Sequence, residues 1–158
     1  MKANIGISEE NRSAVAGQLS KLLADEFVLY TKTKNAHWNI EGPDFHTIHL
    51  FFAIQYQQLD EVMDSVAERI RQIGHYAPAT LAQLLKLTHL TEVSRNINDS
   101  NGFLKELLEN HESIIEFIRG NISPFASKYQ DAGTSDFMTG LLKAHEEMAW
   151  MLRAHLAG

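Results

Sequence analysis

The sequence has no cysteine, only three prolines and no apolar run that approaches membrane-spanning length. The absence of cysteine excludes disulfides and thiolate metal sites and is compatible with the cytoplasm, where we expect the protein. The N-terminus also lacks the charged and then apolar pattern of a signal peptide. With a formal charge of −6, the average surface repels nucleic acid and anionic membranes.

The length of 158 residues suits one domain, which we expect to span residues 1–158. Apolar residues recur at helical spacing nearly throughout, with no convincing strand alternation. Ser8 is a candidate N-cap for a first helix that continues to about residue 35. A second helix starts near Pro43, ends at Gly74 and has the clearest apolar stripe, formed by Phe45, Ile48, Phe52, Tyr56, Leu59, Met63, Val66, Ile70 and Ile73.

Residues 75–98 form a connection that is long for a loop and contains a possible short helix over 80–87. A third helix begins at Asp99 or Ser100, and Gly120 and Pro124 are expected to bend or end it. A fourth helix follows a turn at 131–133. Four long helices with one long central connection predict an all-α four-helix bundle.

Imidazoles and carboxylates lie at opposite ends of one segment, with His37 and His49 near its start and Asp64 and Glu68 near its end. His49 and Asp64 are about 22 Å apart along a helix, whereas a metal–ligand bond is about 2 Å long. One chain therefore cannot close a site from both ends. Two copies packed antiparallel about a two-fold axis near residues 56–58 would form two equivalent sites.

The helical angles permit this arrangement. His49, Asp60, Asp64 and Glu68 share a sector about 100° wide, turned away from the apolar stripe. His37, at the end of the first helix, could add a second imidazole. Mixed imidazole and carboxylate ligation suits Fe(II), among other divalent metals.

A structural interpretation stays open beside this one, and spacing alone favours it. Asp64 and Glu68 could form a solvated face, with Glu68 paired to Arg69 or Arg71, and the histidines could be interface residues satisfied by hydrogen bonds. No Glu-x-x-His pair occurs, which argues against the usual di-iron site inside a bundle. His145 and His155 are interpreted as packing or surface residues.

Several motifs together resemble the DNA-protection-during-starvation (Dps) family, the miniferritins, over nearly the whole chain. They are the His37-Trp38 pair, Gly42, Phe45, His49, Asp64, the Ala67-Glu68-Arg69 run, Asp131-x-x-Thr134-x-Asp136, and His145-Glu146-x-Met148-x-Trp150-Met151-Leu152. Their combination is far more specific than any one of them, and it reverses the preference for the structural interpretation.

The resemblance implies a ferritin-like bundle that assembles into a hollow twelve-subunit cage, a dodecamer. It further implies oxidation of Fe(II), typically by hydrogen peroxide, at sites between two-fold-related subunits, and storage of ferric iron as protection against oxidative stress. His37 and His49 would be ligands from one subunit, Asp64 and Glu68 from its partner, and Trp38 would lie beside the site.

One position departs from the family pattern. The family usually has Asp or Glu four residues after the second histidine, where this chain has Ala53. A methyl group cannot ligate a cation, so we predict a weakened ferroxidase. An iron-storage or structural cage with little or no catalysis is the alternative.

Two further features follow from the resemblance. Asp131 and Asp136 resemble acidic residues that line the family's iron-entry pores, although capping of the last helix explains acidic residues there equally well. Members that bind DNA usually carry a Lys- or Arg-rich tail, whereas this N-terminus has only Lys2 before Ser8. We therefore do not expect DNA binding.

Overall fold

The computed structural model describes residues 3–92 and 98–157, and within these ranges the chain is helical with no strand. Four long helices and one short helix follow in the order α1 (Glu9–Asn39), α2 (Phe45–Gln72), α3 (Leu81–Leu87), α4 (Ser100–Ser127) and α5 (Ala132–Leu156). The expected all-α bundle with a short helix in its central connection is confirmed. Lys2 and residues 93–97 of the connection lie outside the described residues.

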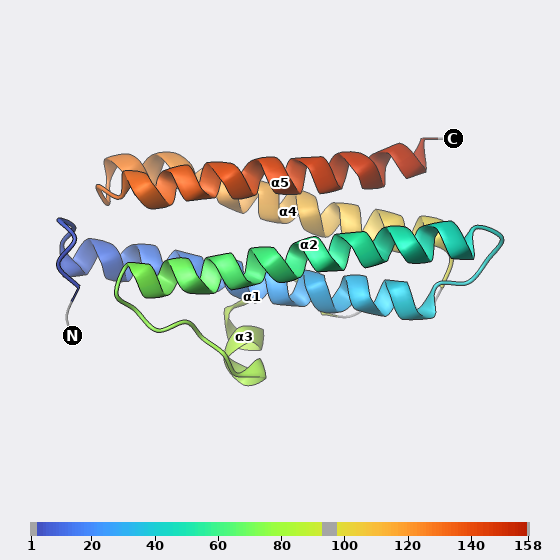
Figure 1. Cartoon of the computed structure of the whole chain (residues 1–158), viewed down its shortest axis with the longest axis horizontal. Coiled ribbons are helices and arrows are strands. Elements are labelled where there is room, and N and C mark those ends of the chain that lie inside the picture. The colour runs from blue at the N-terminus through green and yellow to red at the C-terminus, as the bar shows by residue number, and fades with distance from the viewer. Residues whose placement is uncertain (1–2, 93–97, 158) are drawn as a thin grey trace.

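The bundle consists of two antiparallel hairpins, α1 with α2 and α4 with α5, laid against each other (Figure 1). The turn between α1 and α2 lies at the same end of the molecule as the C-terminus, and the N-terminus lies at the opposite end. After α2 the chain runs back along the outside of α1, where α3 packs, before α4 begins. The two ends of α2 are therefore at opposite ends of the bundle.

Side-chain caps begin the helices where the sequence indicates them. Ser8 accepts a hydrogen bond from the amide of Asn11 at 3.2 Å, and Asp99 accepts one from Gly102 at 2.8 Å. Thr80 and Gln83 form a reciprocal capping box at the start of α3. Each cap satisfies an amide that would otherwise have no partner within its helix.

Three helix limits differ from the expectation, one of them at the start of α5, where Ala132 and Gly133 are helical rather than part of a turn. α1 continues to Asn39 rather than to about residue 35, which places His37 on the helix itself. Pro124 does not end α4, which runs to Ser127. Proline removes one helical hydrogen bond, but Phe125 beside it is fully buried, and the burial of this ring offsets the loss.

The apolar stripe of α2 faces the core along most of its length. Its fully or almost fully buried members are Ile48, Phe52, Leu59, Val66, Ile70 and Ile73. Phe45, Tyr56 and Met63 are less buried. Viewed down the helix axis, these three positions lie within about 20° of one another. They form the edge of the stripe that is farther from the bundle axis. That edge is open in a single chain.

Across the described residues, no helix has both the length and the apolar character needed to cross a membrane.

Candidate metal centre

His37 at the end of α1 and His49 at the start of α2 lie side by side. Their rings stack with centroids 3.8 Å apart and an interplanar angle of 18°. Nδ1 of His37 is 2.7 Å from the carbonyl oxygen of His49, and Nδ1 of His49 is 2.7 Å from the carbonyl oxygen of His37. The pair is thus locked by two reciprocal hydrogen bonds.

These bonds decide which nitrogen of each ring is free. A carbonyl oxygen only accepts, so each Nδ1 must carry the hydrogen and donate it. In a neutral imidazole the other nitrogen, Nε2, then holds the lone pair. Neither Nε2 forms a hydrogen bond to the described part of the chain, and both rings are half-buried. Two imidazole nitrogens are therefore available to a metal ion, and the backbone carbonyls bonded to Nδ1 fix the tautomer of each ring.

The turn between the helices is fixed by contacts with the start of α4. The amide of Glu41 donates to the carbonyl of Asn98 at 2.9 Å, and the hydroxyl of Ser100 donates to Asp44 at 2.6 Å. Gly42 has a φ of +134°, a backbone conformation that residues with a side chain rarely adopt. These contacts hold the turn that places the two histidines side by side.

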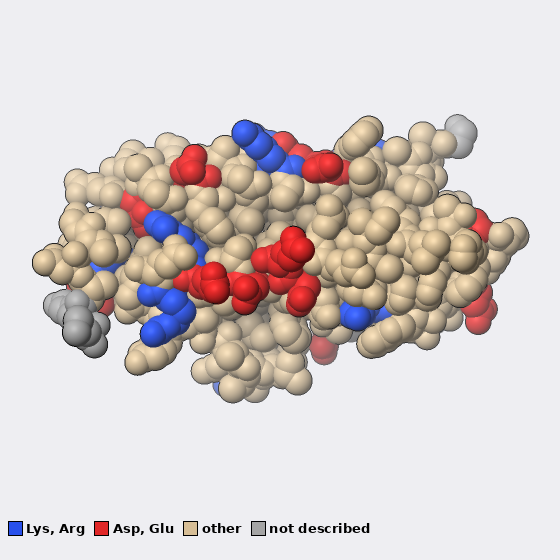
Figure 2. Space-filling view, in the orientation of Figure 1, with Lys and Arg blue, Asp and Glu red and all other residues tan. Residues whose placement is uncertain are grey.

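Asp64 and Glu68 lie on the other half of α2 and are both exposed. Acidic side chains gather over the middle of this helix (Figure 2). Within residues 3–92 and 98–157 neither Asp64 nor Glu68 forms an ion pair or a hydrogen bond, so both carboxylates are free.

The suggested pairing of Glu68 with Arg69 or Arg71 is wrong. Arg69 donates to Thr134 at 3.0 Å and to Asp131 at 3.3 Å. Arg71 donates to the carbonyl of His75 at 2.8 Å. Arg69 is thus bonded to the start of α5 and Arg71 to the connection after α2, so neither guanidinium group pairs with Glu68.

The histidine and carboxylate ends of α2 remain far apart in one chain. His49 and Asp64 belong to one uninterrupted helix, which separates them by about 22 Å. No three metal-binding side chains of the described residues come together closely enough to hold an ion. The carboxylates can therefore reach the histidines only from a second copy.

Ala53 is on the same sector of α2 as His49 and Asp64, one turn after His49, and is half-buried. Asp60 and Glu61 are exposed nearby and line a shallow cavity with Asp64. Among the described residues, no contact holds Asp60 or Glu61 at the position of the missing carboxylate.

An aromatic and cationic group beside the histidines was missed in the sequence. Tyr56 lies edge-on to the ring of His37, with centroids 5.2 Å apart at 75°. The ammonium of Lys34 is 3.8 Å from the Tyr56 ring centre and 5.7 Å from that of Trp38. Trp38 itself is 68% exposed. Helical spacing was the available signal, because Lys34 precedes His37 by three residues and Tyr56 follows His49 by seven.

The two candidate pore residues have different environments. Asp131 is buried and caps α5, accepting from the amide of Thr134 at 2.8 Å and from its hydroxyl at 2.6 Å. Asp136 is exposed and lies inside α5, so it does not start the helix. Capping accounts for Asp131, whereas Asp136 remains open to solvent in one chain.

A separate polar cluster lies inside the bundle, and its members come from three helices. Nε2 of His145 donates to Glu26 at 2.7 Å, and its Nδ1 is 3.0 Å from Nδ1 of His111. All three side chains are fully buried, and Nε2 of His111 and Oε2 of Glu26 have no hydrogen-bond partner among the described residues. Burial and the neighbouring His145 hold the pKa of His111 well below its usual value.

The interpretation of His145 as a packing residue is confirmed, although its polar partners were not foreseen. The available signal was that His111 and His145 occupy apolar-stripe positions of α4 and α5, between Leu107 and Ile114 and between Leu142 and Met148. Both ring nitrogens of His145 are already engaged, so this cluster differs from the free imidazole pair.

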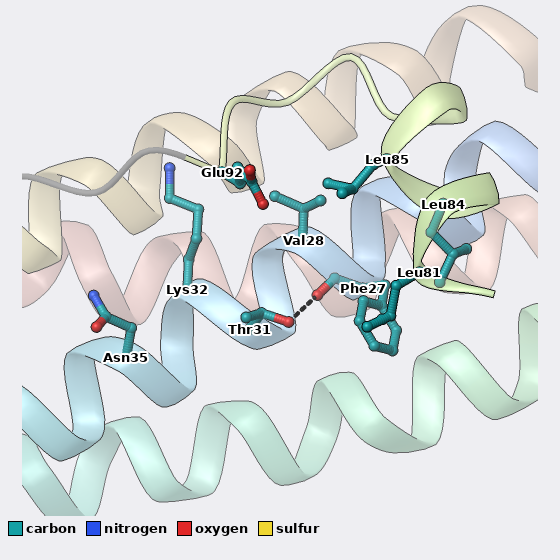
Figure 3. Close-up of a pocket in the computed structure, with 9 residues that line it drawn as sticks. All are labelled: Phe27, Val28, Thr31, Lys32, Asn35, Leu81, Leu84, Leu85 and Glu92. Carbon is teal, nitrogen blue, oxygen red and sulfur yellow. Dashed lines mark hydrogen bonds between the residues drawn. The ribbon is translucent and has the colours of Figure 1, made fainter. Parts of the chain in front are cut away.

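A cavity of about 390 Å³ lies between α1 and α3. Figure 3 shows Phe27 and Val28 of α1 facing the leucines of α3, with Asn35 farther along α1. The ammonium of Lys32 at its edge is held by Glu106 at 2.8 Å. The walls are mostly apolar and carry no converging set of metal donors, so we do not place the metal centre here.

Known proteins share this fold and much of this sequence. The ferritin-like domain family matches residues 16–158. An uncharacterized low temperature-induced protein of Nostoc is 37% identical over 157 residues, covering 99% of this chain and 88% of the relative. The DNA protection during starvation protein of Helicobacter pylori is 34% identical over 139 residues, covering 88% of this chain and 96% of the relative.

The structural similarity is equally extensive. A crystal structure of a Dps protein from Vibrio cholerae, described as a member of a broad superfamily of ferritin-like diiron-carboxylate proteins, aligns with a TM-score of 0.91. It is 29% identical and covers 99% of this chain and 98% of its own.

Proposed function

Since this chain belongs to the Dps family of ferritin-like proteins, we propose that it takes up Fe(II), oxidises it between two copies of the chain and stores the ferric product. Iron storage and ferroxidase activity are general properties of this family. The expected oxidant is hydrogen peroxide. Iron is the substrate and the cargo of this reaction.

The observation that carries the proposal is the locked pair His37 and His49. Each Nδ1 is engaged with a backbone carbonyl, which leaves the lone pair that a metal ligand needs on Nε2 of the neutral ring. The second copy would bring Asp64 and Glu68, whose carboxylates are free in this chain. A two-fold axis near the middle of α2 makes both sites of such a pair equivalent.

The charges of these groups suit the reaction. Two neutral imidazoles and two carboxylates balance the charge of one Fe(II) ion. Compared with water ligands, the two negative charges also stabilise Fe(III) more than Fe(II). The protein's part is to hold and orient iron for electron transfer to peroxide. Ala53 removes one carboxylate from each site, so we expect slower oxidation than a complete ligand set would give.

The proposed assembly is a hollow dodecamer that encloses the ferric product. In this assembly Asp136, which is exposed on α5, would attract cations at the entrance. Asp131 would support the same entrance by capping the helix that presents Asp136.

The test is oxidation of Fe(II) by stoichiometric hydrogen peroxide under anaerobic conditions. The assembled protein should oxidise Fe(II) faster than buffer. The double variant with His37→Ala and His49→Ala should oxidise it at least tenfold more slowly than the wild type. His155→Ala is the matched control, because His155 is exposed and lies at the end of α5. Oxidation no faster than in buffer would remove the enzymatic half of the proposal.

Ala53 favours the alternative function, a storage cage in which mineral grows without real catalysis. The variant Ala53→Asp separates the two functions. A several-fold gain in oxidation rate over an already active wild type indicates a weakened ferroxidase. Activity that appears only in the variant supports the storage cage.

A further inference from the structure

The electron balance of the proposed reaction depends on how many iron ions the centre with Ala53 holds. Reduction of hydrogen peroxide to water takes two electrons, and oxidation of one Fe(II) ion provides one. Two iron ions in one centre would provide both. Ala53 lacks the carboxylate that a second ion would need, so a centre that holds one ion at a time needs another electron donor.

We infer that Tyr56 is this donor, an inference that rests on the proposed ferroxidase function. Its ring lies edge-on to His37 with centroids 5.2 Å apart, and it is half-buried on α2. Tyr56 is two helical turns after His49 and lies close to the same sector of the helix. It is therefore in contact with a proposed ligand without being a ligand itself.

The step balances in atoms, charge and electrons. Fe(II), the Tyr56 phenol, one hydrogen peroxide and one proton give Fe(III), the neutral Tyr56 phenoxyl radical and two water molecules. Peroxide is reduced at its O–O bond, while iron and the phenol each lose one electron. The phenol also loses its O–H proton, which ends in water.

The neighbours of Tyr56 determine which form of the oxidised ring can exist. The Lys34 ammonium is 3.8 Å from the ring centre, and its positive charge disfavours a ring that has lost an electron but kept its proton. Electron and proton must therefore leave together, which gives the neutral radical.

Two other oxidisable rings are less favourably placed. Trp38 is 68% exposed, and its ring contacts the Lys34 ammonium rather than either histidine. Tyr30 contacts Tyr56 at 6.2 Å, edge to face, and is one ring farther from His37. Tyr56 is thus the tyrosine that contacts His37 directly, and Tyr30 provides a matched control.

The experiment uses the assembled protein with all tyrosines deuterated on the ring. Anaerobic Fe(II) is mixed with an equal amount of hydrogen peroxide, frozen within milliseconds to seconds, and measured by electron paramagnetic resonance. We expect an organic radical signal that narrows on deuteration of tyrosine. Tyr56→Phe, which keeps the ring packing, should reduce the signal at least tenfold, whereas Tyr30→Phe should keep most of it.

The iron-to-peroxide ratio gives a second readout. Wild-type protein should consume one Fe(II) per peroxide in the first turnover. Ala53→Asp should move that ratio toward two and lower the radical signal, because the second iron then provides the second electron.

Failure of this inference is distinct from failure of the proposed function. Rapid Fe(II) oxidation with no tyrosine-derived signal, or with a signal that persists in Tyr56→Phe, overturns the role of Tyr56 alone. Oxidation no faster than in buffer overturns the ferroxidase function and the role of Tyr56 with it.

Discussion

At the scale of single residues, backbone carbonyls decide the chemistry of the histidine pair. His37 and His49 each donate from Nδ1 to the other residue's carbonyl oxygen. The rings are held in one tautomer before any ion arrives, so little ordering is left for binding. Replacing either histidine by a residue of similar shape would keep the packing and lose the ligand.

His111 shows the opposite use of an imidazole, since it is buried without a charge. Its pKa lies well below the ordinary 6.5, because burial and the neighbouring His145 disfavour the protonated ring. The unfolded chain binds this proton below about pH 6.5, while the folded chain does not. The contribution of His111 to stability is therefore complete above that pH and is lost as the pH falls.

We predict that the free energy of unfolding declines between pH 7 and pH 5, by at most about 1.4 kcal/mol per pH unit from this group. Urea unfolding at several pH values measures the decline. His111→Gln should flatten it, whereas His155→Gln, at an exposed site, should follow the wild type. An equal slope in all three proteins would contradict the assignment to His111.

At the scale of elements, two polar residues of α1 hold the connection that follows α3. Asp25 accepts from the hydroxyl of Thr88 at 2.6 Å and from the amide of His89 at 3.0 Å. Lys32, two turns later, donates to the carbonyl of Thr91 at 3.0 Å. These contacts fix where residues 88–91 of the connection lie against α1.

Asp25 performs this role at a cost. Burial raises the pKa of its carboxyl, although Thr88 and His89 act in the opposite direction. Because the folded chain holds this proton more tightly, the contribution to stability is complete below the ordinary pKa of 3.8 and is lost as the pH rises through the raised value. Ionisation of Asp25 is therefore harder in the folded chain than in the unfolded chain.

We predict that Asp25→Ala lowers the free energy of unfolding by about 1–3 kcal/mol at pH 7, since two donors lose their acceptor. Asp25→Asn keeps an acceptor without the charge, so it should cost less than the alanine variant. Hydrogen exchange at residues 88–91 should quicken in Asp25→Ala and stay near the wild-type rate in Asp25→Asn. If both variants quicken it alike, the hydrogen bonds are not what holds the connection.

At the scale of the whole molecule, the proposed site belongs to a pair of chains. A subunit with His37→Ala and His49→Ala, and a subunit with Asp64→Asn and Glu68→Gln, should each form inactive assemblies. A mixed pair contains one doubly damaged site and one intact site. Random mixing of equal amounts should therefore restore about a quarter of the wild-type sites.

This recovery is measured as peroxide-dependent Fe(II) oxidation after the two proteins are unfolded and refolded together. Each variant refolded alone serves as its own control. If a single chain supplied every ligand, the mixture would stay as inactive as its components. That result would exclude a site shared between copies.

The charge of the whole molecule leads to the prediction about DNA. A formal charge of −6 opposes binding to the phosphate backbone. In a gel-shift experiment with duplex DNA at ~0.15 M salt, we expect no complex at micromolar protein. A complex that persists at this salt concentration would contradict the electrostatic argument.

Residue spacing alone predicts the helices and the two groups of candidate ligands, histidines at one end of α2 and carboxylates at the other. Spacing places a residue along a helix and on one of its faces, and both are local properties of the chain. The stripe of α2, the cap at Ser8, and the separation of His49 from Asp64 all follow from it. The motifs also identified the family and the departure at Ala53.

The packing of the helices, by contrast, settles which side-chain atoms have partners and which are free to bind a ligand. The free Nε2 atoms of His37 and His49, the contact of Tyr56 with His37, and the partners of Arg69 depend on how one helix packs against another. The same holds for the burial of His145 between Glu26 and His111. Spacing within one helix gives no distance to the next, so these contacts became visible only when the helices were packed together.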